Sequence, residues 1–118
     1  MKKILLLSLI LFGVKVFSQD TVNYLDVNSQ RQGKWIVRGD EAHKFWYRPD
    51  QIVQTGSYIN NKKTGTWTEY YMNNNLKSEI TFVNGFPKGR LVVYDSLFSR
   101  RVLAEGVFEN GFFVPKKP

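Results

Sequence analysis

Apolar and polar residues alternate with a period of two along several stretches of the chain. In residues 76–82, every second side chain is small or apolar, which would place these side chains on one face of an extended strand. Residues 102–108 repeat this alternation, and residues 90–94 are rich in the β-branched and aromatic residues that favour strands. Beyond the N-terminal segment, no stretch of ten residues shows the 3.6-residue apolar period of a helix. The pattern predicts an all-β fold.

Clusters of turn-forming residues separate the predicted strands. Residues 60–65 and 84–89 both begin with asparagine and end with glycine, two residue types that adopt positive φ readily. Residues 72–75 and 95–99 form polar linkers between successive strand pairs. The chain is therefore expected to form an extended meander of antiparallel β-hairpins.

Four sets of positions recur along the chain, mostly at intervals of 24 or 26 residues. One set is aromatic and is followed two residues later by a turn asparagine. Agreement among four sets predicts an array of structural repeats. The sets are Tyr58, Phe82 and Phe108; Gly33, Gly65 and Gly89; Trp46, Tyr70 and Tyr94; and Ile52, Leu76 and Val102.

The first repeat departs from the others. Trp35 and Trp46 are 11 residues apart, whereas the corresponding Trp67 and Tyr70 are 3 apart. An insertion of about eight residues near 37–44 would account for the difference, and it predicts a longer first hairpin.

The first 18 residues have the three-part layout of a secretory signal peptide. A basic start at residues 1–3 precedes an apolar run at 4–14, and residues 16–18 fit a cleavage site. The run is shorter than the ~20 apolar residues of a spanning helix, although a retained membrane anchor is the alternative. We expect the mature chain to begin near Gln19 and to reach the periplasm or surface of a Gram-negative bacterium.

The composition narrows the classes of function. The 118 residues include no Cys and one His, which excludes disulfide scaffolds and thiol nucleophiles and disfavours a multi-His metal site. The one histidine, His43, lies in the predicted insertion and is interpreted as a solvated loop residue. Without the leader the chain keeps 14 basic and 10 acidic residues, a mild positive balance. We expect no enzyme activity, no cofactor, no metal and no nucleic-acid partner.

A motif shared by the two central repeats extends this interpretation. Its segments are 65–71, 75–77, 82–85 and Gly89. The motif resembles the MORN repeat, in the variant of the bacterial YwqK-family antitoxin-like proteins. The resemblance covers roughly residues 32–113 in about four units, and it departs from the pattern at Leu91, where tryptophan is expected. It implies a twisted sheet of antiparallel hairpins that contacts proteins or lipids, and it implies no catalytic residues.

The predicted elements divide the chain into a leader and one repeat domain. The length leaves room for a single domain rather than two. The expected parts are a signal peptide at 1–18, a lead-in at 19–31, the repeats at 32–113 and a C-terminal tail at 114–118.

Side-chain direction along the strands separates core from surface candidates. Tyr58, Trp67, Phe82 and Phe108 are interpreted as the core of a thin sheet. Tyr70 lies three residues from Trp67, and an odd offset places it on the opposite face.

The same offset places Tyr94 opposite Leu91, and we expect this second face to be open to solvent. A neighbouring arginine pair could meet an anionic group. The candidate binding residues are Tyr70, Val92, Tyr94, Arg100 and Arg101.

These features favour a non-catalytic interaction module. The expected function is protein–protein contact at the cell envelope, with either a second copy or another envelope protein as partner. The alternative is the binding of an envelope polysaccharide or a lipid headgroup.

Overall fold

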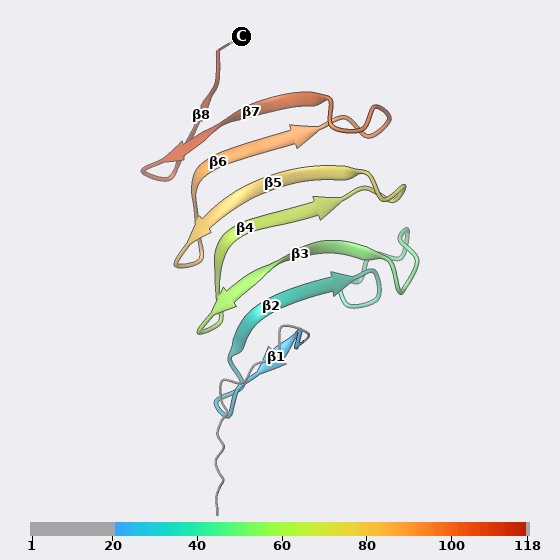
Figure 1. The fold of residues 1–118 in the computed structure, drawn as a ribbon, viewed down its shortest axis with the longest axis vertical. Coiled ribbons are helices and arrows are strands. Elements are labelled where there is room, and N and C mark those ends of the chain that lie inside the picture. The colour runs from blue at the N-terminus through green and yellow to red at the C-terminus, as the bar shows by residue number, and fades with distance from the viewer. Residues whose placement is uncertain (1–20, 118) are drawn as a thin grey trace, which may run out of the picture.

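Residues 21–117 form one antiparallel sheet of eight strands whose spatial order is their order in the chain (Figure 1). A computed structural model describes residues 21–117, and these residues contain no helix. The all-β prediction and the meander of hairpins are confirmed. The predicted leader and its cleavage near Gln19 lie outside the described residues. The strands are β1 (Tyr24–Leu25), β2 (Arg31–Arg38), β3 (Ile52–Ile59), β4 (Lys62–Tyr70), β5 (Leu76–Val83), β6 (Phe86–Tyr94), β7 (Val102–Glu109) and β8 (Phe112–Pro115).

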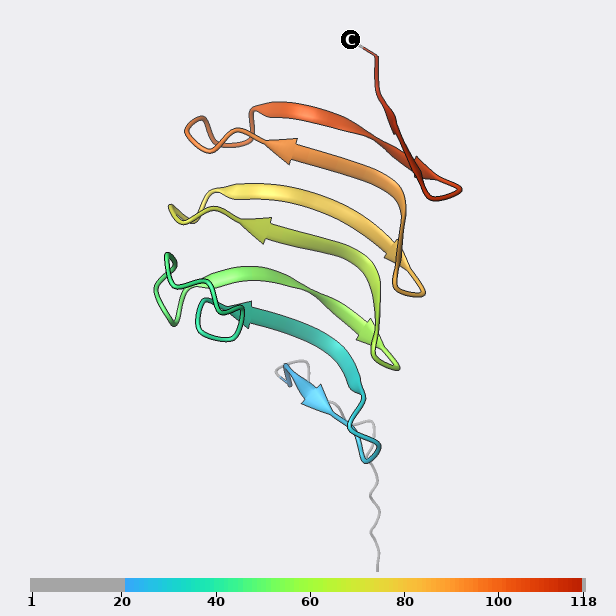
Figure 2. The ribbon, with the colours of Figure 1, turned by 180° about the vertical axis from the view of Figure 1, so that it is seen from behind.

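The sheet has two long edges of different character, visible from both sides in Figures 1 and 2. One edge carries the tight turns that join β3 to β4, β5 to β6 and β7 to β8, and we call it the tip edge. The other carries the connections at 39–51, 71–75 and 95–101, and we call it the loop edge.

The three turns of the tip edge have the same backbone geometry. Both residues of each turn have positive φ: for Asn84 and Gly85 the values are 51° and 85°. Positive φ at both positions fits a type I′ turn, whose twist matches that of the flanking strands. The equivalent pairs are Asn60-Asn61 and Asn110-Gly111. The six-residue turns predicted at 60–65 and 84–89 are wrong in length, because the strands resume after two residues.

The glycines that were expected to end these turns lie inside strands instead. Gly65 and Gly89 have φ of 70° and 91°, and the register of the adjoining ladder shifts close to each. A Cβ on Gly65 would meet nothing within 4 Å, so the backbone conformation rather than space requires glycine there. These glycines form β-bulges, which bend the strand and increase its twist.

The register assigns side chains to the two faces of the sheet. Trp67 lies opposite Ile80, which lies opposite Leu91 on the next strand. On the other side of the sheet, Glu79 lies opposite both Thr68 and Val92. We call the first side the aromatic face and the second the polar face. The aromatic face carries Trp35, Tyr58, Trp67, Phe82, Phe108 and Phe113.

The centre of the aromatic face is the core of the molecule. Trp67 is 1% exposed, and its ring meets the Tyr58 ring edge-on with centroids 5.0 Å apart. Its indole Nε1 donates to the carbonyl of Ser57 at 3.0 Å. Gly56 makes room for this ring, because a Cβ there would lie 2.0 Å from an indole carbon. The interpretation of Tyr58 and Trp67 as core residues is confirmed.

The rest of the aromatic face is less covered than expected. Phe82 and Phe108 share this face with Tyr58, as predicted, but both are only half-buried. The reason is architectural: the described residues form a single sheet with no second layer to cover the face.

The first repeat differs from its prediction. The connection from β2 to β3 is an irregular loop at 39–51 rather than a longer hairpin. Trp46, which the repeat pattern aligned with Tyr70 and Tyr94, is exposed in this loop. The sheet also extends past the expected repeat boundaries, since β1 lies in the lead-in and β8 runs to Pro115.

Candidate binding surface on the loop edge

Every connection of the loop edge exposes apolar side chains to solvent. Phe45 in the first loop is 90% exposed, and its ring meets Trp46 edge-on at 5.1 Å between centroids. Each of the three loops carries at least one such side chain, so the exposed apolar residues recur along the sheet. The exposed residues of this row are Phe45, Trp46, Met72, Leu97 and Phe98.

Tyrosine hydroxyls join each loop to the neighbouring repeat. Tyr47 Oη donates to the carbonyl of Tyr70 at 2.7 Å, and Tyr71 Oη donates to the carbonyl of Tyr94 at 2.7 Å. Tyr47 is buried, and this burial raises the pKa of its phenol. The structural repeat on this edge is therefore Tyr47 and Tyr71. Their 24-residue spacing is present in the sequence, although the same interval also aligns Trp46 with Tyr70.

Side-chain amides make a second set of links between loops. The buried Gln51 donates from Nε2 to the carbonyl of Met72 and, at 2.8 Å, to Oδ1 of Asn74. One repeat further on, Asn73 and Asn75 both donate to the carbonyl of Ser96, at 2.7 and 2.9 Å. Because these bonds fix the loops to one another, the exposed apolar residues sit on a supported backbone.

A hollow of about 340 Å³ is lined by residues of all three loops and of β5. Trp46, Tyr71 and Met72 form its apolar walls, while Asn73, Lys77 and Ser96 supply polar groups. The Lys77 ammonium lies 5.7 Å from the Tyr71 ring centroid, within reach of a weak cation–π contact. The hollow can accept an apolar group that is flanked by hydrogen-bonding or anionic groups.

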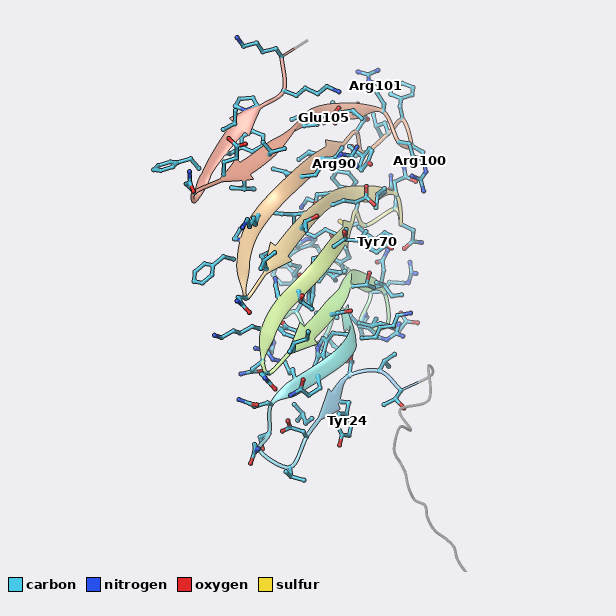
Figure 3. All side chains as sticks on the ribbon, turned by 60° about the vertical axis from the view of Figure 1, so that its left-hand side comes forward. Tyr24, Tyr70, Arg90, Arg100, Arg101 and Glu105 are labelled. Atoms are coloured by element: carbon cyan, nitrogen blue, oxygen red, sulfur yellow. The ribbon has the colours of Figure 1, made fainter. Side chains whose placement is uncertain are left out.

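The predicted arginine pair belongs to this edge. Arg100 and Arg101 are exposed in the loop at 95–101, and Figure 3 shows them above the end of β4 that carries Tyr70. Arg101 Nε lies 3.6 Å from Asp95 Oδ2, and its guanidinium lies 5.1 Å from the Phe98 ring centroid. The Asp95 carboxylate also accepts the backbone N–H groups of Phe98 and Leu97, which hold the pKa of Asp95 below its usual value.

Two other predicted site residues are buried, so the expectation of an open face around them is wrong. Val92 is 0% exposed and Tyr94 is 7% exposed, although both lie on the polar face as predicted. Tyr94 Oη donates to Glu79 at 2.7 Å, which raises the pKa of the phenol. Arg90 lies 3.6 Å from Glu105, the residue opposite Val92. Glu79 and Glu105 flank Val92 on the two neighbouring strands, and long side chains of this kind shield an apolar neighbour from water.

The two remaining residues considered from the sequence, Tyr70 and His43, both lie at the loop edge. Tyr70 is half-buried at the end of β4, where its carbonyl accepts the Tyr47 hydroxyl. His43 is exposed in the loop at 39–51 with φ of 55°. Its exposure agrees with its interpretation as a solvated loop residue. Within residues 21–117, no three His, Asp or Glu side chains gather closely enough to hold a metal ion.

Among the described residues there is also no helix that is long and apolar enough to cross a membrane. The chain matches no protein-family model, and no curated protein or solved structure is similar to it at a significant level.

Proposed function

We propose that this protein is an exported, non-catalytic repeat module that mediates protein–protein contact at the cell envelope through its loop edge. The observation that carries the proposal is the row of exposed apolar side chains on three successive loops. Exposed apolar patches mark interaction sites in soluble proteins.

The composition and the rigidity of the edge support a protein partner. Aromatic residues, methionine and arginine are the residue types enriched in protein interfaces, and all occur here. The links from Tyr47, Tyr71 and Gln51 hold the loops in place. A preorganised surface loses less conformational entropy when a partner binds. The MORN-like motif supports a contact role, and the leader-like residues 1–18 support export.

Substitution of the most exposed aromatic pair tests the proposal. Mature protein carrying Phe45→Ser and Trp46→Ser should lose the partner that wild-type protein captures from envelope extracts. Phe86→Ser is the matched control, because Phe86 is a similarly exposed aromatic residue on the tip edge. Equal capture by the double variant and the wild type would exclude the loop edge as the contact surface.

One observation favours a polysaccharide or lipid headgroup as the alternative ligand. The hollow combines the Trp46 and Tyr71 rings with Asn73 and Ser96, a combination that can stack on a sugar ring and bond its hydroxyls. The same capture experiment distinguishes the classes when the bound material is assayed for glycan and lipid. Retention of glycan or lipid with no protein, lost in the double variant, would establish the alternative.

The export part of the proposal has its own measurement. The intact mass of protein purified from its native host should correspond to a chain that begins within about two residues of Gln19. A mass that includes residues 1–18 would contradict secretion by cleavage.

A further inference from the structure

The last strand of the sheet, β8, is apolar, and among the described residues it is paired on one side only. Phe112–Pro115 (β8) pairs only with β7, and the described residues place nothing beyond it (Figure 1). Phe112 is 75% exposed, and Phe113 and Val114 are also exposed. A short apolar edge strand is a template for pairing with another strand.

The hydrogen-bonding direction of β8 follows from one bond. The backbone N–H of Lys116 donates to the carbonyl of Glu105 on β7 at 2.8 Å. Since backbone groups alternate direction along a strand, Phe112 and Val114 also bond toward β7, while Phe113 and Pro115 point outward. Proline has no N–H, so Phe113 supplies the one outward backbone donor of β8.

We propose that two copies of this chain associate through their β8 strands, antiparallel to each other, about a two-fold axis at Phe113. In this arrangement each Phe113 N–H donates to the carbonyl of Phe113 in the second copy. Phe112 of one copy lies opposite Val114 of the other, which covers both exposed side chains. The association uses a surface remote from the loop edge and does not depend on the proposed function.

Pro115 selects this register among those that are sterically close. If Phe113 instead faced Pro115 of the second copy, the Phe113 carbonyl would lie against the pyrrolidine ring. It would then receive no hydrogen bond, because proline has no N–H. In the register centred on Phe113, the ring falls beside the turn at Asn110-Gly111, beyond the paired strands. Pro115 therefore restricts the pairing of β8 to a short strand and opposes longer additions.

Two observations point to a second copy rather than another protein. The Phe113 ring lies 5.5 Å from the Phe108 ring, and the two-fold axis would join this pair to the same pair in the second copy. The four rings would continue the aromatic face across the junction. In addition, the exposed Lys117 would pass the hairpin tip of the second copy, where the exposed Glu109 forms no ion pair within the described chain, whereas Lys116 already lies 3.6 Å from Glu105.

A charge exchange at the axis tests the proposal. Because the axis places residue 113 against itself, Phe113→Lys and Phe113→Glu should each weaken self-association at least about tenfold in sedimentation equilibrium. An equimolar mixture of the two variants should associate again as a heterodimer. Failure of the mixture to associate, or a wild type that stays monomeric at millimolar concentration, would overturn the proposal.

A cysteine variant provides an independent measurement. The chain has no native Cys, so Phe113→Cys places a single thiol at the axis, where paired Cα atoms about 5.5 Å apart can form a disulfide. Oxidation should cross-link Phe113→Cys far faster than Phe86→Cys on the tip edge. Equal cross-linking rates would contradict the arrangement. The Phe45→Ser and Trp46→Ser variant should self-associate like the wild type, which separates this result from the test of the loop edge.

Discussion

The two long edges of the sheet both reverse the chain between neighbouring strands, but they do so with different structures. On the tip edge, three two-residue turns of one geometry reverse the chain, and their positive φ angles dictate asparagine and glycine. On the loop edge, connections of unequal length at 39–51, 71–75 and 95–101 are held by side-chain hydrogen bonds. The comparison teaches that backbone geometry fixes the tip edge, while the loop edge is free to vary its exposed residues.

Both edges depend on the core of the aromatic face, so its loss should have the largest effect. Trp67→Ala removes a fully buried ring, its contact with Tyr58 and its bond to Ser57, and should lower the free energy of unfolding by about 3–5 kcal/mol. Urea denaturation measures this change. Phe82→Ala should cost less, because Phe82 is half-buried. Equal costs for the two variants would mean that the depth of the core is misassigned.

A backbone change should separate the two edges. Gly85→Val forces a β-branched residue to φ near 85° and should destabilise the protein by about 1–3 kcal/mol. Leu97→Val, an exposed substitution on the loop edge, should stay within about 0.5 kcal/mol. The thermal midpoints of the two variants give the comparison. Similar midpoints would show that the turn geometry does not control the tip edge.

Removal of one hydroxyl should measure how strongly side chains hold the loop edge. Tyr71→Phe deletes the bond to the Tyr94 carbonyl and should cost about 0.5–1.5 kcal/mol. Tyr47→Phe removes the equivalent bond one repeat earlier and should cost a similar amount. A double variant as stable as the wild type would show that these bonds do not support the loops.

The smallest effect on stability is expected at the exposed row itself. Phe45→Ser with Trp46→Ser should change the free energy of unfolding by no more than about 0.5 kcal/mol, since both side chains are exposed. Circular dichroism with thermal melting checks this. A large destabilisation would assign the pair to the packing of the loop and would weaken its role as a contact surface.

Period-two alternation predicted the central strands but not the outer strand β1. Alternation over residues 76–82 predicted β5 almost at its observed bounds, Leu76–Val83, because one side of the strand is more apolar than the other. The Asn-Gly and Asn-Asn pairs located the tip turns. Their length was overestimated because a glycine such as Gly89 serves equally well in a turn and in a bulge within a strand.

The candidate site was harder to predict for two physical reasons. Alternation assigned Tyr94 to the correct face but not its depth, which depends on contacts with neighbouring strands such as the bond from its hydroxyl to Glu79 on β5. The first loop is irregular, so its residues need not occupy the places that strand residues occupy one interval later. The 24-residue interval nevertheless aligned Trp46 of the loop with the strand residues Tyr70 and Tyr94. The arginine pair was identified from charge alone, whereas the exposed row needed the three-dimensional arrangement.

The agreement between strand order and chain order has a consequence for how the molecule is made. Every ladder joins strands that are consecutive in the sequence, so no strand pairs with a segment far away in the chain. A chain that emerges N-terminus first can complete each hairpin before the next one arrives. In the finished sheet, opening should begin at the outer strands and proceed inward. Amide hydrogen exchange should therefore be fastest in β1 and β8 and slowest in β4 and β5.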